Sequence, residues 1–484
     1  MRIPSSSPVS LALALALGGC AVGPNYVRPA VNAPDHFIGT AEVAAREAAQ
    51  PADLALWWEG FHDPLLTRLI DEAEANNLDI AQALARVGQA KAGLNAATAA
   101  LLPSGGVQAS AGRAETSQDV PLGIAGRELG FPRATNSYEG DLTASWEIDI
   151  FGGLRRGREA AADSYQGSEA GAVAARLAVA AQVADSYVVV RGLQARLEIA
   201  RAQVATQQKL VDTVRLQDAK GIASDLQLHQ AEGALAQVRS TIPGLEDGIN
   251  AAMNALDVLL GQQPGIVRAR LATPAPIPQA PAISDAGGPA DLLRRRPDII
   301  VAERHLAATN AEVGQAMAEY YPKVSLTGLL GTASTVGTGA LFTGSATQAQ
   351  GFGGLRWRLF DFGRINAEIK AAKGARAEAL AAYRQTVLRA SEDVENAFSA
   401  LVRREQQARI LGDGEQSLAQ ARTQSEAAYK GGVVSLIEVL DADSRLLQTR
   451  DQHAEAQTEA ARAAVSSFRA LGGGWNPPAR LARD

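Results

Sequence analysis

The sequence predicts a mixed, mainly α-helical protein in which one arrangement of helices and a β-hairpin occurs twice. Three observations predict this fold class. No proline lies between Pro132 and Pro243 or between Pro322 and Pro477, which permits very long helices. One segment, residues 138–149, alternates apolar or small and polar residues as a half-exposed β-strand does. The two halves of the chain also match at constant spacings.

The composition excludes several classes of function. The 484 residues include 46 basic and 52 acidic side chains, a balance that does not suggest a nucleic-acid-binding protein. The single cysteine, Cys20, excludes an intrachain disulfide and a cysteine-based zinc site. The five histidines show no metal-ligand spacing, and no paired acid and base or nucleophile cluster suggests an enzyme.

The N-terminus predicts a signal peptide over residues 1–19. Arg2 provides a positive charge, and Leu11–Leu17 form an apolar run that is too short to span a bilayer. The small residues before Cys20 resemble the lipobox of bacterial lipoproteins. That resemblance implies a covalent diacylglycerol and an N-acyl lipid such as palmitate on Cys20. Ala21, where an aspartate would retain such a lipoprotein in the inner membrane, implies the outer membrane; the alternative is an ordinary secretory signal.

The rest of the chain offers no uninterrupted apolar run of about 18 residues. The most apolar stretch, residues 171–190, contains Arg176, Gln182 and Asp185. We therefore expect no transmembrane helix, and any membrane span has to come from β-strands.

An internal duplication organises the mature chain. Trp146 and Trp357 lie 357 − 146 = 211 residues apart, and Gly221 and Gly432 share that spacing. Upstream the spacing is 219, so the first half carries eight more residues between its proline and its tryptophan, where we expect a loop. The expected divisions are an N-terminal lipidated extended segment 20–60, a first repeat 61–262, a Pro-rich linker 263–289, a second repeat 290–472 and a tail 473–484.

Each repeat begins with an expected helical run, residues 65–100 or 290–319, followed by two strands. The strand at 138–149 is longer than the five or six residues usual in soluble sheets and suits a transmembrane barrel. Weaker strands are expected at 104–112, 323–334 and 351–360. Trp146 and Trp357, near strand ends, suit an interfacial aromatic belt; the alternative is a core tryptophan.

Two hairpins give four strands per chain, and four strands cannot close a barrel because the smallest transmembrane barrels have eight. Several chains therefore have to share one barrel. A dimer would supply eight strands and a trimer twelve, and the residues do not choose between them.

The helices are expected to be long and to pack as coiled coils. A helix from about residue 157 to residue 219 would be roughly 90 Å long. Apolar residues follow heptad spacing in both halves, as in Leu197, Val204 and Val211. Each long helix meets its return helix at a short tip. Gly221 and Gly432 can end the first helix in the left-handed conformation, and Ser224 and Ser435 can cap the second.

Four motifs carry a resemblance to a known family: "CAVGPNYVRP" (20–29), "WWEGFHDPLL" (57–66), "DLLRRRPDI" (291–299) and "FDFGR" (360–364). In this order they resemble the outer-membrane lipoprotein channels of tripartite multidrug efflux systems, close to the OprM and NodT group of the TolC family. The match covers nearly the whole mature chain.

The resemblance implies a homotrimer with a twelve-stranded barrel continuous with an α-helical periplasmic tunnel. It implies two protein partners, a periplasmic membrane-fusion adaptor that meets the helix tips and an inner-membrane resistance-nodulation-division pump. The channel would conduct drugs or other small molecules passively. Two alternatives stay open: a channel for secreted protein or oligosaccharide, and a lipid-anchored periplasmic coiled-coil scaffold without a pore.

A candidate periplasmic gate follows the second tip. Asp441 lies four residues before Arg445 and so shares a helix face with it, which alone indicates a surface pair. The resemblance places Asp441 and the apolar Ile437 in the closed mouth of the family's channel, but the family's arginine aligns with Ser444. Three copies of Asp441 about 6 Å apart would repel by roughly 1–3 kcal/mol per pair, so a closed ring needs neighbouring cations, of which Arg445 is the nearest.

Overall fold

A computed structural model describes residues 21–31, 34–46, 52–283 and 288–476 of the chain. The expected signal peptide and Cys20 lie outside the described residues. The chain forms two compact units. The first holds the described part of the N-terminus to Pro29 with Gly88–Gly167 and Glu303–Ala382. The second holds the described parts of Ala30–Val87, Ser168–Ala302 and Tyr383–Asp484.

The order of helices and strands confirms the internal duplication. Helices α4 (Leu78–Ala99) and α10 (Pro297–Ala318) have 22 residues each. The long helices α6 (Gly153–Ala219) and α11 (Arg364–Lys430) have 67 each, and the return helices α7 (Asp225–Leu259) and α12 (Leu436–Ala470) have 35 each. Equal lengths follow from packing, because an insertion in a long packed helix shifts every later side chain to another face. The shorter elements are α2 (Thr40–Ala44), η1 (Leu54–Phe61), α3 (Pro64–Asn76), α8 (Arg268–Leu271) and α9 (Pro289–Arg295).

The expectation of one helical run before each hairpin was wrong, because each run is two helices. In the first half the chain breaks at Asn77, whose side-chain Oδ1 accepts from the N–H groups of Asp79 and Ile80 and starts α4. In the second half Arg296 is extended and Pro297 begins α10. Proline disfavours a helical conformation in the residue before it, which ends α9.

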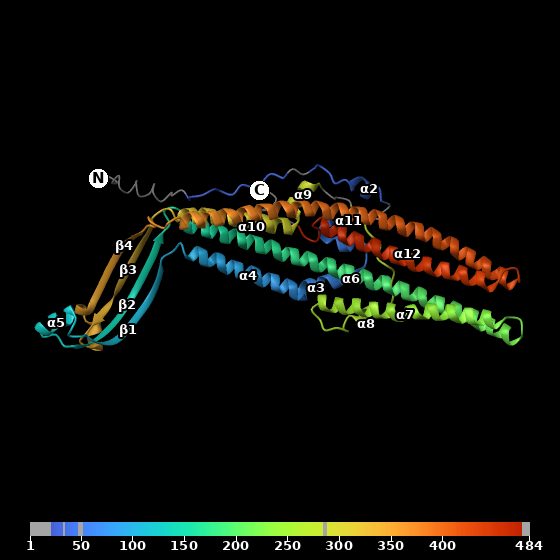
Figure 1. Cartoon of the computed structure of the whole chain (residues 1–484), viewed down its shortest axis with the longest axis horizontal. Helices are drawn as coiled ribbons and strands as arrows, with labels where there is room; N and C mark the ends of the chain where they lie inside the picture. Colours follow the sequence, from blue (N-terminus) through green and yellow to red (C-terminus); the bar gives the residue numbers. More distant parts are fainter. Residues whose placement is uncertain (1–20, 32–33, 47–51, 284–287, 477–484) are drawn as a thin grey trace, which may run out of the picture. The chain divides into compact units, whose positions relative to one another are not determined.

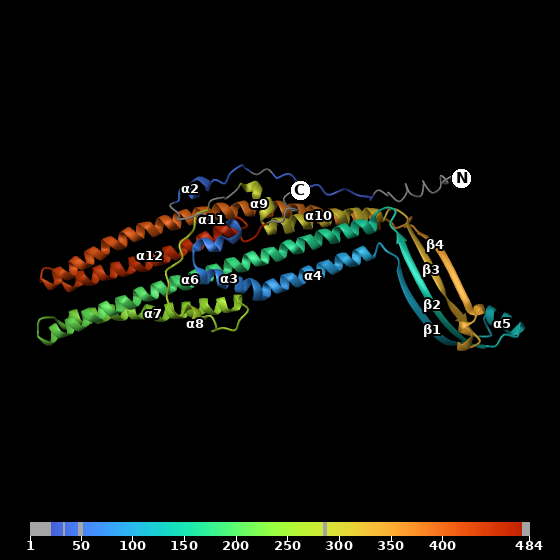
Figure 2. The ribbon, with the colours of Figure 1, turned by 180° about the vertical axis from the view of Figure 1, so that it is seen from behind.

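The four strands form one antiparallel sheet in the order β1-β2-β3-β4 (Figures 1 and 2). Strand β3 (Lys323–Ser334) has the expected bounds. Strand β1 (Ser104–Glu115) extends three residues beyond the expected end. Strand β2 (Ala134–Ile148) begins four residues before the expected start and ends one residue before the expected end, and β4 is Thr347–Arg356 rather than 351–360. The loop within the first hairpin contains the eight-residue helix α5 (Pro121–Glu128), and that within the second contains the short 3-10 helices η2 (Thr338–Phe342) and η3 (Gly344–Ala346).

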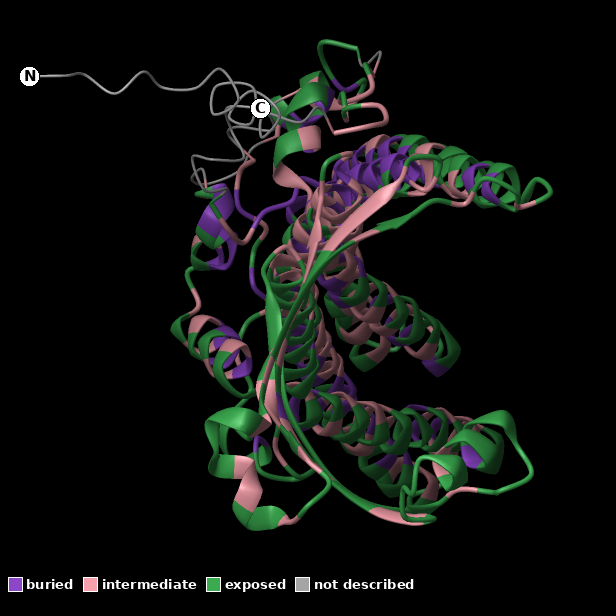
Figure 3. Cartoon of the chain, turned by 90° about the vertical axis from the view of Figure 1, so that its left-hand side faces the viewer, coloured by how far each residue is buried: buried purple, intermediate pink, exposed green. Residues whose placement is uncertain are grey.

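The sheet has almost no buried surface. Figure 3 shows the curved strands exposed or half-buried, whereas buried residues gather on the helices. Across the four strands, all of which the structure describes, only Asp141 is buried. A sheet exposed on both faces cannot be held by its own core, so it needs another surface on at least one face.

The core of the second unit lies between the long helices. Val183, Ala184, Tyr187, Val188 and Val190 of α6 are completely buried. The heptad positions expected in the second half are also buried: Tyr383, Val387, Ala390, Val394, Ala397 and Leu401. Helices α6 and α7 form one hairpin and α11 and α12 another, which lie side by side in this unit (Figures 1 and 2).

Helix α6 is the one helix in the described part of the chain that is long and apolar enough to cross a membrane. Its most apolar window has a mean hydropathy of 1.5 and is half buried within this single chain. A core helix has the same composition, and the buried residues of α6 lie in that part of it. The absence of a transmembrane helix stays a prediction.

A buried polar network ties the linker to α6. The hydroxyl of Tyr187 donates to Asp63 at 2.5 Å, and the Arg191 guanidinium donates to Tyr187 at 3.1 Å and to the carbonyl of Thr273 at 2.9 Å. Burial, together with the hydrogen bond to Asp63, raises the pKa of Tyr187 to about 12, so the phenol stays protonated at neutral pH. The network fixes the linker that joins the two halves.

One departure from regular helix chemistry lies in α7, which continues through Pro243. A proline inside a helix has no N–H to donate, so the carbonyl of Arg239 lacks its usual intrahelical partner. The equivalent residue of α12, at the spacing of 211, is the buried Ala454. Of the two return helices, α7 therefore lacks one intrahelical hydrogen bond at a position where α12 has an ordinary residue.

Candidate functional site

The register of the strands gives the sheet an apolar face. Residues directly opposite on neighbouring strands point to the same face. Leu142 of β2 lies opposite Val107 of β1 and Leu330 of β3, and all three side chains are exposed. Four residues further along β2, on the same face, Trp146 lies opposite Leu326. Exposed apolar rows across several strands are the pattern of a lipid-facing surface.

The other face of the sheet is polar. Asp141 of β2 lies opposite Gln108 and Gly331, and Gln348 of β4 donates to Asp141 at 2.8 Å and to Glu139 at 3.1 Å. A Cβ on Gly331 would lie 2.0 Å from the Asp141 carboxylate, so only glycine fits there. Acidic and amide groups on this face suit a water-filled lumen rather than lipid.

The two tryptophans near the strand ends have equivalent contacts. The indole N–H of Trp146 donates to the carbonyl of Leu101, and that of Trp357 donates to the carbonyl of Tyr320, both at 2.9 Å. Leu101 and Tyr320 are themselves equivalent at the spacing of 219. Each indole thus ties the end of a hairpin to the segment that precedes it. A place at the membrane interface stays a prediction for both residues.

The two helical hairpins turn at glycines with positive φ. Gly221 has φ +71° and Gly432 has φ +70°, a region in which only glycine avoids a steric penalty. Ser224 and Ser435 stand at the expected N-cap positions of α7 and α12. Ser435 makes no side-chain capping bond, so that part of the expectation was wrong. At Ser224 the side chain of Gln227 accepts from the serine N–H at 3.0 Å.

Each tip also presents two exposed apolar side chains. Ile222 and Leu226 at the first tip, and Val433 and Ile437 at the second, have between 57% and 79% of their surface exposed. The two pairs are equivalent at the spacing of 211. The repeat thus places the same apolar surface at the end of both hairpins.

The candidate gate residues lie on one exposed helix face. The Arg445 guanidinium is 2.9 Å from the Asp441 carboxylate, and Ile437 lies one turn before Asp441. Both charged side chains are more than half exposed, so the pair alone contributes no more than about 0.3–0.5 kcal/mol. The first hairpin has Gln230 and Ala234 at the equivalent positions. The ion pair is therefore a feature of the second hairpin alone.

A buried acid beside this face was not expected from the sequence. Asp443 is 1% exposed, accepts from Arg422 of α11 at 2.9 Å and lies 3.4 Å from the Gln207 amide of α6. The sequence does contain a signal for this burial, because Asp443 shares a helix face with Val439 and Leu446, which are buried. An acid at a buried helix position requires a partner on a facing helix. Asp443 therefore links the second hairpin to the first.

Two further ion pairs hold α6 against α12. Arg196 pairs with both carboxylate oxygens of Asp451 at 2.7 and 2.8 Å, and Arg462 pairs with those of Asp185 at 2.7 and 3.2 Å. The hydrogen bond that Arg196 donates to Asp451 raises the pKa of Arg196, and the one that Arg462 donates to Asp185 raises the pKa of Arg462. Bidentate arginine–carboxylate pairs fix the relative orientation of the two side chains as well as their distance.

In the first unit the N-terminal segment 21–29, which we name the strap, lies along the helices. The buried Arg156 donates to the carbonyls of Val22 and Gly23 and to the side chain of Asn25, at 2.8 to 3.2 Å. A Cβ on Gly23 would lie 2.4 Å from the backbone of Gly314. Hydrogen bonds and close backbone packing therefore both fix the position of the strap.

A buried glutamate holds the far end of the strap. Glu303, with 2% of its side chain exposed, pairs with Arg28 of the strap and, at 2.8 Å, with Arg304. Burial alone would raise the pKa of Glu303, but the hydrogen bond from Arg28 and the charge of Arg304 hold it below its ordinary value. The carboxylate is therefore charged at neutral pH.

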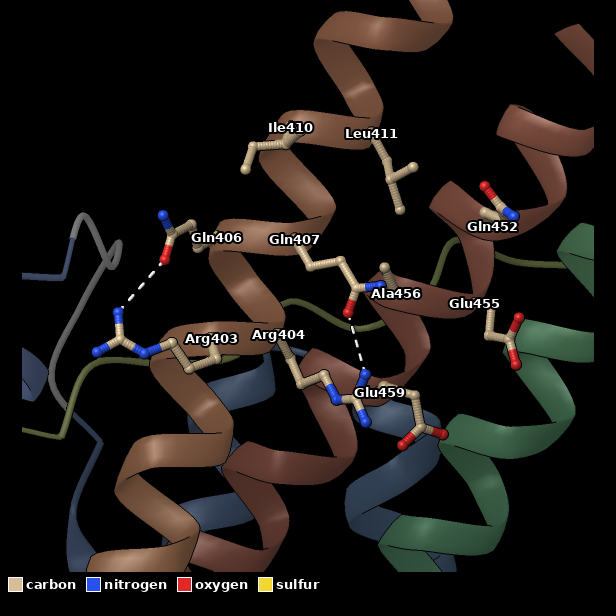
Figure 4. A pocket seen from close by; sticks show the side chains of 10 residues that line it. All are labelled: Arg403, Arg404, Gln406, Gln407, Ile410, Leu411, Gln452, Glu455, Ala456 and Glu459. Atoms are coloured by element: carbon tan, nitrogen blue, oxygen red, sulfur yellow. Dashed lines mark hydrogen bonds between the residues drawn. The ribbon is translucent and has the colours of Figure 1, made fainter. Parts of the chain in front are cut away.

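The acidic and histidine side chains that the structure describes form no metal site. Within the described ranges, no group of three or more His, Cys, Asp or Glu side chains is placed to hold a metal ion. A groove of about 690 Å³ opens between α11 and α12. Figure 4 shows its arginines pairing along their own helix, Arg403 with Gln406 at 3.4 Å and Arg404 with Gln407 at 3.0 Å, rather than converging on one point.

Comparison with known proteins gives one consistent result. The sequence model of the family described as "Outer membrane efflux protein" matches residues 69–262 and 288–473. The outer membrane protein OprJ of Pseudomonas aeruginosa is 32% identical over 480 residues, 98% of this chain and 97% of that protein. The cation efflux system protein CusC of Escherichia coli is 30% identical over 476 residues, 96% of this chain and 97% of that protein.

The fold comparison agrees. The solved structure of the outer-membrane channel OprN superposes with a TM-score of 0.85 at 31% identity and covers 94% of this chain and 100% of that one. The similarity therefore includes both the strands and the long helices.

We expect Glu303→Gln to weaken the hold on the strap in a pH-dependent way. Because the pKa of Glu303 is lowered in the folded protein, its ion pairs stabilise fully above the ordinary value of 4.5 and lose this effect as the pH falls through the lowered value. At about pH 7 the variant should lose about 1–3 kcal/mol of stability, seen as a lower midpoint of thermal unfolding by circular dichroism.

The gap between the two proteins should close as the pH falls below the lowered pKa of Glu303. The exposed Glu378→Gln serves as the control and should follow the wild type at every pH. A gap that persisted unchanged in acid would show that shape, and not charge, is what Glu303 contributes.

Proposed function

We propose, from the premise that this chain belongs to the outer membrane efflux protein family, that it forms the exit duct of a tripartite efflux pump. Family membership makes the chain an outer-membrane efflux channel that extends into the periplasm, and not an enzyme. The observation that carries the proposal is the sheet with one apolar and one polar face, whose strand β2 runs directly into the long helix α6.

The duct we propose is a homotrimer. The sheet of one chain ends in two unpaired edges, β1 and β4, and is exposed on both faces. In a bilayer unpaired backbone groups have no water to bind, so the edges have to be closed by other strands. Three copies give a twelve-stranded barrel, with the row of Leu142 facing lipid and the row of Asp141 facing the lumen.

The partners we propose are a periplasmic membrane-fusion adaptor and an inner-membrane resistance-nodulation-division pump. The exposed apolar side chains beside Gly221 and Ser224, and beside Gly432 and Ser435, support a docking role for the tips. The duct has no energy source of its own and conducts passively, so the pump supplies the driving force. Its cargo is proposed only as small molecules, because the relatives differ in function, as the cation efflux protein CusC illustrates.

The tip glycines provide a test of docking. We expect Gly432→Val to abolish ethidium efflux and adaptor co-purification, because valine at φ +70° costs at least about 1–2 kcal/mol and reshapes the turn. Gly374→Val is the matched control, since nothing lies within 4 Å of that helical position. Both variants should assemble normally. If the wild-type gene failed to restore efflux to a strain deleted for it, the proposed function itself would be wrong.

We propose that Cys20 carries a diacylglycerol and an N-acyl chain, which adds a lipid anchor to the strands. The support is the position of the strap: the N–H of Val22 donates to the carbonyl of Phe151, just beyond the end of β2. We expect mass spectrometry of the mature protein to find an acylated N-terminal cysteine. We also expect Cys20→Ser, with a cleavable signal, to remain in the outer membrane; its complete loss from the membrane would show that the lipid is the main anchor.

We propose that Asp441, Arg445 and Ile437 line the resting periplasmic mouth of the duct. In a trimer three copies of this face converge on the axis, and each arginine offsets the repulsion among the three carboxylates. We expect Asp441→Ala to raise the single-channel conductance in planar bilayers, because it removes both the charge ring and the ion pair.

The control for the gate is Asp225→Ala, which removes an exposed acid from the other tip and should leave the conductance unchanged. Arg445→Ala should raise it, because the carboxylates then repel without a cation. Unchanged conductance in both Asp441→Ala and Arg445→Ala would refute the gate and leave the duct itself standing.

A further inference from the structure

We infer from the internal repeat that β4 of one copy pairs with β1 of the next copy in a single register, in which Trp357 lies opposite Val107. We further infer that Phe362 packs against Leu102 of the next copy. The inference rests on the proposed sharing of one barrel by several copies. It goes further by naming which backbone groups meet, which the sequence of a single strand does not determine.

The two hairpins of one chain pair their strands in the same register. The β1–β2 ladder ends at the pair Ser104 and Ser145, and the β3–β4 ladder ends at the pair Lys323 and Arg356. Lys323 follows Ser104 by 219 residues, and Arg356 follows Ser145 by 211 residues. These are the two spacings of the duplication, so the second hairpin repeats the register of the first.

Within the chain, the joint between the hairpins is the β2–β3 ladder, in which Trp146 lies opposite Leu326. Between copies, the corresponding joint is β4 against β1 of the next copy. The residue equivalent to Trp146 in the other half, at the spacing of 211, is Trp357. The residue equivalent to Leu326, at the spacing of 219, is Val107. The repeat therefore predicts that β4 and β1 of the next copy pair in the same register as β2 and β3 do within one chain.

The end of β4 supports this transfer. Residues 146–148 belong to β2 because they pair with β3, since the β1–β2 ladder has already ended at Ser145. Their equivalents are residues 357–359, which lie outside β4 in a single chain. In the inferred joint they gain residues 105–107 of the next copy as partners. This explains why alternation in the sequence predicts a strand to residue 360 while the isolated sheet ends at Arg356.

The chemistry of the two edges agrees with the register. Leu355 lies opposite Val324, which lies opposite Ile148, so it belongs to the apolar face. The inferred register places Leu355 opposite Ala109 of the next copy, which shares the apolar face with Val107. A slip by one residue would set the apolar face of one copy against the polar face of the next.

The aromatic contact follows from the same equivalence. In the β2–β3 joint Phe151 stacks on Tyr321, with ring centroids 4.6 Å apart and planes at 21°. The equivalents are Phe362 and Leu102, and neither is covered in the single chain: Phe362 is fully exposed and Leu102 is 62% exposed. The backbone differs between the equivalent positions, because Phe362 has φ +54° whereas Phe151 does not have a positive φ. The contact with the next copy covers both side chains.

Disulfide cross-linking in outer membranes tests the register. We expect the double variant Leu355→Cys with Ala109→Cys to form covalent dimers and trimers on mild oxidation, seen on non-reducing gels. Directly opposite Cβ atoms lie about 4.5–5.5 Å apart, close to disulfide geometry, whereas a shift by two residues moves them to about 7–8 Å. The shifted pairs, Leu355→Cys with Val107→Cys or Ala111→Cys, should cross-link at least about tenfold less.

A second pair tests the contact independently. Phe362→Cys with Leu102→Cys should also link copies, whereas the neighbouring exposed Phe360→Cys with Leu102→Cys should not. The wild type, whose only cysteine is Cys20, controls for links through that residue.

The outcomes separate this inference from the proposed function. Cross-links found only in a shifted pair, or in no pair, while ethidium efflux and the oligomer persist in the variants, would overturn the register and leave the duct intact. An absence of oligomers from the wild type, together with an absence of efflux, would overturn the proposed function on which the inference rests.

Discussion

The constraint on which the rest of the structure depends is the pairing of backbone N–H and C=O groups at the edges of the sheet. One chain contributes four strands and leaves β1 and β4 open. In water such edges are tolerated or covered, but in a bilayer each unpaired group costs several kcal/mol. The chain therefore cannot complete its membrane-spanning part alone. In the proposed shared barrel, the exposed faces of the sheet, the early end of β4 and the uncovered Phe362 all follow from the same incompleteness.

The internal duplication is the way the chain meets that constraint. If every joint between hairpins is to be alike, the hairpins have to share register, and the structure gives both ladders the same ending. The helices follow, with 67 residues in each long helix and 35 in each return helix. Differences between the halves then mark special roles, because symmetry does not require them. The ion pair of Asp441 with Arg445 occurs in one half only.

The sequence predicts those parts of the fold that periodicity encodes. Strand β3 has the expected bounds, and α6 begins four residues before the expected 157, because period-two and heptad patterns are local. What it missed depends on tertiary contacts. Asn77 reads as an ordinary helix residue until its side chain is seen to cap α4. Asp443 reads as another surface acid beside Asp441, although it is buried against Arg422 of another helix. The carboxylate predicted to form the gate, Asp441, is exposed. The carboxylate that links the two hairpins, Asp443, lies two residues further along α12.

Asp443 also bears on which hairpin can move. At the spacing of 211, the partner Arg422 corresponds to Val211, which in the first hairpin packs in an apolar cluster with Ala231 and Leu235. The second hairpin thus replaces an apolar contact by an ion pair at the same height. Separating apolar surfaces exposes them to water at a cost of about 25 cal/mol per Å², whereas a separated ion pair regains hydration that offsets much of the lost attraction. Because each of these contacts lies within one hairpin, α12 can separate from α11 at this height at lower cost than α7 can separate from α6. Helix α12 also carries Asp441, so the proposed gate lies on the return helix that leaves its own partner helix more readily.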